Sequence, residues 1–149
     1  MALIEAELMT YLLSKASVTA LVGTRVFRVF VPQSNSGNAQ SDVGKLPRIV
    51  LQRVTGGRSY FIGGGDGLPM PTIQLSCQAL TYGAAKAIAD ALRMVLDGFS
   101  GTMGSTYVGV CVQDNETDIY EPPDDARDQG VHQCVLDYRI AYTETAPTL

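Results

Sequence analysis

The stretch Thr72-Ile73-Gln74-Leu75-Ser76-Cys77-Gln78-Ala79 alternates strictly between polar and apolar residues. Such alternation is typical of a β-strand with one buried face and one face in water. The sequence therefore predicts a strand at 72–79 whose odd-numbered residues face the core: Ile73, Leu75, Cys77 and Ala79.

The hydrophobic period changes directly after this strand. Apolar residues now recur at spacings of three and four, which is typical of one face of an α-helix. The Thr81 hydroxyl can cap the start of this helix, and Gly98 can take the left-handed conformation that ends it. We expect the helix to pack on the preceding strand through an alanine-rich stripe: Ala84, Ala85, Ile88, Ala91, Leu92, Val95 and Leu96.

The residues before this unit predict two helical segments and two strands. A first helix is expected at 2–15, and Ser17 is expected to cap a short helical turn at 18–22. Runs rich in β-branched and aromatic residues predict strands at 25–31 and 48–55.

The residues after the central helix predict two more strands, at 106–113 and 131–143. In the first of these, Val108, Val110 and Val112 are expected to share one face. The second alternates over its whole length and is expected to be the longest strand of the sheet.

Polar and glycine-rich segments separate these elements. We expect long loops at 33–46, 56–69 and 114–130, and a frayed tail at 144–149. A single helix joins consecutive strands, so the order of elements favours the α+β class. We expect one domain over residues 1–149, with a mostly antiparallel sheet of about five strands and two main helices packed on one face.

The composition limits the class of protein. The chain has 149 residues, of which 46% are hydrophobic and 17% are charged, so a folded core is expected. Its net charge of −4 argues against a general nucleic-acid-binding surface, which would be basic. No apolar run is long enough to cross a bilayer, and Glu5 and Glu7 stand where a signal peptide would carry basic residues. We expect synthesis in the cytoplasm and no membrane partner.

The glycine-rich segment Gly56–Gly67 is a candidate functional loop. It does not predict a phosphate site, because no Gly-Lys-Ser/Thr follows and the next element is a strand rather than a helix. The segment can be a flexible connection. The interpretation we favour is an arm that orders on a partner, with three apolar anchors and one polar anchor: Tyr60, Phe61, Ile62 and Arg58.

Histidine and cysteine do not form a metal motif. His132 and Cys134 share a strand face, but Cys77 and Cys111 are single residues on other strands and there is no Cys-x-x-Cys pair. A Cys–His nucleophile pair also lacks a third group to orient the base. We expect neither a metal nor another cofactor.

The run Tyr120–Asp128 gathers carboxylates around two prolines. It contains Asp124, Asp125 and Arg127, but it lacks the Asp-x-Asp-x-Asp-Gly spacing of a calcium loop. We interpret it as a solvated acidic loop or as a docking surface for a basic partner. The alternative is a small cytosolic enzyme, such as a hydrolase, or an adaptor that uses residues 118–128.

Short packing motifs follow one another along nearly the whole chain. In order, they are Leu8-x-x-Tyr11-Leu12-Leu13, Val18-x-Ala20-Leu21-Val22-Gly23-x-Arg25-Val26-Phe27, Val31-Pro32-Gln33, Leu46-Pro47-Arg48-Ile49-Val50, Ile73–Ala79, Tyr82-x-x-Ala85-x-x-Ile88-Ala89, Leu96-Asp97-Gly98, Asp118-x-Tyr120-Glu121 and Val135–Ile140. The ordered set resembles the tail-completion proteins of long-tailed bacteriophages, a family that includes tail terminator and head–tail joining proteins.

This resemblance implies a structural virion protein of the tail or neck, made in the host cytoplasm, and not an enzyme. It implies a ring, typically a hexamer, at the head-proximal end of the tail. The implied partners are further copies of the chain, the tail tube protein and a head completion or connector protein. DNA would pass through the lumen without specific binding, and an acidic chain is compatible with a lumen that repels phosphates.

Overall fold

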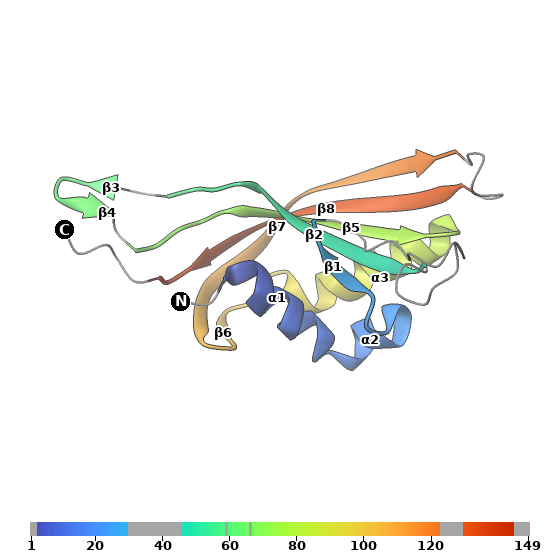
Figure 1. The fold of residues 1–149 in the computed structure, drawn as a ribbon, viewed down its shortest axis with the longest axis horizontal. Helices are drawn as coiled ribbons and strands as arrows, with labels where there is room; N and C mark the ends of the chain where they lie inside the picture. The colour runs from blue at the N-terminus through green and yellow to red at the C-terminus, as the bar shows by residue number, and fades with distance from the viewer. Residues whose placement is uncertain (1–2, 30–45, 59, 66, 123–129, 145–149) are drawn as a thin grey trace, which may run out of the picture.

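The computed structural model describes residues 3–29, 46–58, 60–65, 67–122 and 130–144. Three helices lie on one face of a six-stranded sheet (Figure 1): α1 (Ile4–Leu13), α2 (Ala16–Val22) and α3 (Tyr82–Leu96). The strands of this sheet are β1 (Val26–Arg28), β2 (Arg48–Thr55), β5 (Thr72–Ala79), β6 (Gly101–Met103), β7 (Thr106–Glu121) and β8 (Val131–Tyr142). A separate two-stranded sheet joins β3 (Tyr60–Phe61) to β4 (Gly64–Gly65).

The order of the main sheet is β1-β2-β5-β8-β7-β6. Every neighbouring pair is antiparallel except β1 and β2, which are parallel. The α+β class and the helices on one face are therefore confirmed. The expected sheet of about five mostly antiparallel strands is imprecise, because the observed sheet is mixed and includes the short strand β6, which the sequence pattern did not reveal.

The unit β5–α3 forms the centre of the core, as the alternating strand and the helical stripe predict. Ile73, Leu75 and Cys77 are fully buried, and the helix packs on this face of the sheet. The Ala84 amide donates a hydrogen bond to the Thr81 hydroxyl over 3.2 Å, which confirms the predicted cap. The buried stripe differs from the prediction at two residues: Ala89 is buried, whereas Ala84, beside the cap, faces solvent. Ala91 and Val95 are partly buried against the core.

Two predictions about the N-terminal third are wrong in detail. Helix α2 begins at Ala16 after Lys15, whose backbone carbonyl accepts from the Val18 amide, so Ser17 lies inside the helix and caps nothing. Strand β1 is shorter than predicted at its described end, since it ends at Arg28, and residues 30–31 of the predicted strand lie outside the described residues. The reason is local, because Val29 has a φ of 68° and leaves the extended conformation.

Strand β7 is much longer than predicted. The sequence predicts a loop from residue 114, but residues 115–121 pair with β8 in an antiparallel ladder, after a shift of register between Gln113 and Asn115. A bulge between Val108 and Val110 shifts the alternation by one residue, so that Val108 and Cys111 face the core. The prediction that Val108, Val110 and Val112 share one face is therefore wrong.

Candidate interaction surfaces

The glycine-rich segment forms a projecting arm, which we define as its described residues between 56 and 69. In Figure 1 it extends beyond one end of the main sheet, away from the three helices. The pairs Tyr60–Gly65 and Phe61–Gly64 form its two-stranded tip, so the expected loop is partly a β-hairpin.

Backbone contacts fix the base of the arm. The Met70 amide donates to the Gly57 carbonyl over 2.7 Å. A Cβ on Gly57 would lie 2.6 Å from the Met70 carbonyl oxygen, so this close approach requires glycine. Arg58 forms an ion pair with Glu144 beside the last strand. Arg58, expected as a polar anchor for a partner, is thus engaged within its own chain at the base of the arm.

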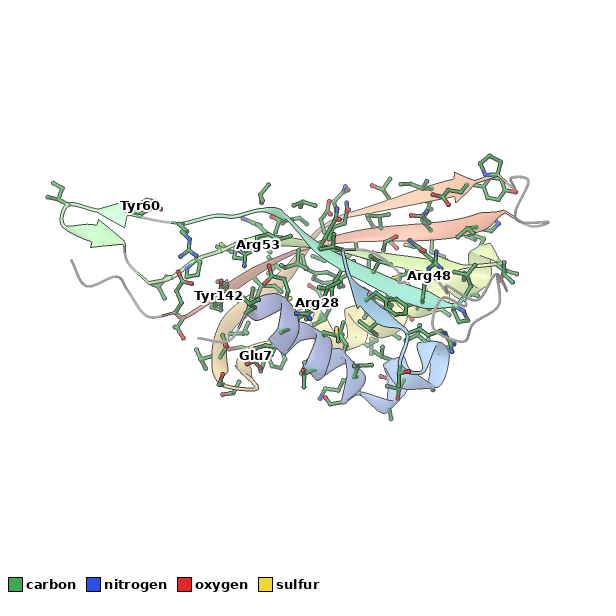
Figure 2. The ribbon with its side chains drawn as sticks, viewed as in Figure 1. Glu7, Arg28, Arg48, Arg53, Tyr60 and Tyr142 are labelled. Carbon is green, nitrogen blue, oxygen red and sulfur yellow. The ribbon has the colours of Figure 1, made fainter. Side chains whose placement is uncertain are left out.

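The tip of the arm exposes large apolar side chains. Ile62 is fully exposed and Tyr60 is 73% exposed, and Figure 2 shows Tyr60 far out on the arm, remote from the helices. Burial of such residues against a second surface would release about 1.5–3 kcal/mol for a large apolar side chain. The tip is therefore a candidate contact for another protein.

The second half of β7, residues 114–121, carries acids on both faces, and we call it the far half of β7. Glu116 and Asp118 lie on the side of α3, while Asp114 lies near Arg139, with 2.5 Å between its Oδ2 atom and the Arg139 Nε atom. The remaining residues of the acidic candidate surface, Asp124, Asp125 and Arg127, lie outside the described residues. The sequence could not show that the acidic residues up to Glu121 are part of a sheet.

Lys86 of α3 binds both acids on its side of β7. Its Nζ atom lies 2.8 Å from Asp118 and 3.2 Å from Glu116. The hydrogen bond from Lys86 is the main cause that lowers the pKa of the Asp118 carboxyl, against a smaller opposing effect of burial. The positive charge of Lys86 and a hydrogen bond from Tyr82 lower this pKa further. A carboxyl with a lowered pKa is held in its charged form, which suits an ion pair rather than a general acid.

The cysteines and the histidine form no catalytic or metal arrangement in the described part of the chain. Burial raises the pKa of the Cys134 thiol to about 12, so the thiolate that a nucleophile requires is not populated near neutral pH. His132 lies between two tyrosine rings, with centroids 4.8 Å from Tyr120 and 6.2 Å from Tyr82. Among the described residues, no three His, Cys, Asp or Glu side chains are grouped to hold a metal ion.

A groove of about 420 Å³ separates α3 from the far half of β7. We call it the α3–β7 groove. The residues that matter for its chemistry come from both walls and from β8 beneath: Ala87, Asp90, Arg93, Gln113, Glu116 and Leu136. No sequence signal predicted this groove, because it depends on the unexpected length of β7.

The opposite face of the sheet carries a polar ladder. Arg48 donates to Gln78 over 2.6 Å, and Ser76 donates to Gln133 over 3.1 Å. These side chains come from β2, β5 and β8, and none of the described helices covers this face (Figure 1). The sequence predicts a polar, solvent-facing side for β5, and this polar face therefore extends across three strands.

The sequence matches a known protein family over most of its length. Residues 6–143 match the family described as tail completion protein gp17. The chain belongs to this family. As a gp17-family protein it is a structural component of a phage tail and of the virion, as the resemblance predicts.

A solved chain shows that the fold of the gp17-family protein recurs. It comes from the virion of a native gene transfer agent particle, and the two superpose with a TM-score of 0.64 at 18% sequence identity over 95% of each chain. No curated protein matches the sequence. Within the described residues, the helices are too short or too polar to span a membrane.

Proposed function

We propose that the gp17-family protein forms a closed ring, a hexamer, at the head-proximal end of a phage tail. In this position it terminates the tail tube and joins it to the head connector. The observation that carries the proposal is family membership over nearly the whole chain, since the match includes the core, the arm and both long strands.

The shape of the chain is compatible with assembly into a ring. The arm projects at one end of the long axis and the far half of β7 lies at the other (Figure 1). Unlike surfaces at opposite ends favour head-to-tail contacts between copies, and such contacts close into rings when the rotation is suitable. The uncovered polar face of the sheet and the net charge of −4 suit a passage through which DNA moves without specific binding.

Deletion of the gene from its phage, followed by imaging of the tails, tests the proposal. We expect tails without a terminal ring that fail to join heads, and restoration of joined particles when the gene is supplied in trans. Normal joined virions that lack this protein would refute it, as would labelled protein located elsewhere in the particle.

The alternative of an enzyme using residues 118–128 gains no support from the described residues. Such an enzyme needs a carboxyl with a raised pKa in a cleft. The pKa of Asp118 is instead lowered, and this carboxylate is bound to Lys86. An adaptor unrelated to phage is disfavoured by the family match.

A further inference from the structure

In the described part of the chain, the outer edge of β7 has no neighbouring strand over its far half. Strand β6 pairs only with Thr106–Val108, and the segment that precedes β6 continues the contact as far as Cys111. From Asn115 to Tyr120, the residues that the structure describes place no strand beside this edge (Figure 1). The backbone amides and carbonyls on that side can therefore accept an extended segment as a further strand.

The α3–β7 groove adjoins β7 on the side of the helix, because one of its walls is β7 and the other is α3, so a side chain of an added strand can reach it. Its charges are already paired within the chain: the Arg93 guanidinium lies 2.7 Å from Asp90, and the Lys86 ammonium lies 3.2 Å from Glu116. A charged guest would find no free partner among these side chains. The groove therefore suits an uncharged, apolar segment.

The tip of the arm, Tyr60–Gly65, has these properties. It contains no charged residue, and it is already extended in β3 and β4. Its exposed Ile62 provides an apolar anchor. Gly64 and Gly65 carry no side chains, so their backbone can approach the helix wall closely.

Two observations indicate that the guest comes from a second copy. The tip lies at one end of the long axis, whereas α3 and the end of β7 lie toward the other (Figure 1). Since these two elements line the groove, the arm is remote from the groove of its own chain. Direct pairing of two β7 edges would bring Asp114, Glu116 and Asp118 of one copy close to the same acids of the other, which is unfavourable. The contact between copies is therefore tip to groove rather than edge to edge.

We propose that the tip of the arm of one copy adds to the β7 edge of the next copy and places Ile62 in its α3–β7 groove. This contact rests on the proposed ring and names the two surfaces that would close it. Each copy then donates one arm and receives one, as a head-to-tail ring requires.

Cross-linking in assembled particles tests this contact. One full-length chain carries Ile62→Cys and a second carries Asp90→Cys, and both are expressed during phage growth in place of the natural protein. Purified particles are treated with a short bismaleimide. The three native cysteines are buried, so they give little background. We expect a covalent dimer that contains both chains.

The matched control replaces Asp90→Cys by Leu21→Cys, which is exposed on α2 and outside the groove. Equal cross-linking to Leu21→Cys, or none to Asp90→Cys in particles that contain both chains, overturns the tip-to-groove contact and leaves the proposed ring intact. Normal joined particles without either chain overturn both proposals.

A second pair of variants blocks the groove without touching the core. Ala87→Arg fills the groove, and Ala84→Arg places the same side chain at another exposed site on α3. We expect Ala87→Arg to reduce incorporation into particles by about tenfold or more, as for the loss of a central apolar contact, and Ala84→Arg to leave it unchanged. Thermal unfolding of the purified monomers checks that both variants fold. Equal incorporation of the two folded variants contradicts the proposal.

Discussion

The hairpin formed by β2 and β5 connects two regions with opposite environments. Within the domain, Leu51 and Leu75 face each other at paired positions and are fully buried. At its far end the same hairpin becomes the arm, where Ile62 is fully exposed. The difference indicates a division of roles, because the inner part stabilises the fold while the outer part carries apolar surface for assembly.

Truncation of a core residue should give the largest effect on the free energy of unfolding. Leu92 is fully buried against the sheet, so Leu92→Ala removes apolar contacts and leaves a cavity. We expect a loss of about 2–5 kcal/mol in urea unfolding of the monomer. Met94→Ala, on the same helix but 72% exposed, should change it by less than about 0.5 kcal/mol. Equal losses would show that α3 is not docked as described.

Overpacking of the alanine-rich stripe should give a smaller effect. Ala89 is 4% exposed and belongs to the core cluster, so a phenyl ring there must displace its packed neighbours. We expect Ala89→Phe to destabilise the monomer by about 1–3 kcal/mol, measured by thermal unfolding. The control is Ala87→Phe, two residues earlier on the exposed side of α3. It should leave the melting temperature nearly unchanged.

The ion pair of Asp118 with Lys86 should contribute a small stability that depends on pH. The pKa of Asp118 is lowered in the folded chain below its ordinary value of 3.8, chiefly by the Lys86 hydrogen bond, so the unfolded chain binds the proton first. The contribution is present above pH 3.8 and is lost as the pH falls through the folded pKa. The difference in free energy of unfolding between the natural chain and Asp118→Asn, which we call the stability gap, should therefore shrink in acid. A gap that stays constant from neutral pH to below 3.8 would contradict this assignment.

Substitution at the tip of the arm should have the smallest effect on the monomer. Ile62→Ser removes a side chain that is fully exposed, so the free energy of unfolding should change by less than about 0.5 kcal/mol. The same variant should incorporate poorly into particles. A monomer that is clearly destabilised by Ile62→Ser would remove the distinction between the core and the arm.

Local pattern in the sequence determined the centre of this protein. The alternation at 72–79, the helical stripe after Thr81 and the left-handed Gly98 each depend on neighbours within a few residues, and the structure confirms them. The ordered motifs also led to the right family. The glycine-rich segment with three large apolar residues also predicted an arm, and its binding of a partner stays a prediction.

Only the tertiary structure decided the edges of the sheet. Residues 114–121 have a polar, acidic sequence typical of a loop, yet they form a strand because β8 offers a complete ladder of partners. The bulge beside Gly109, the parallel β1–β2 pair and the short β6 likewise depend on strands distant in sequence. The α3–β7 groove follows from that geometry. Backbone pairing between distant segments leaves no local pattern of side chains, so the sequence alone could not reveal it.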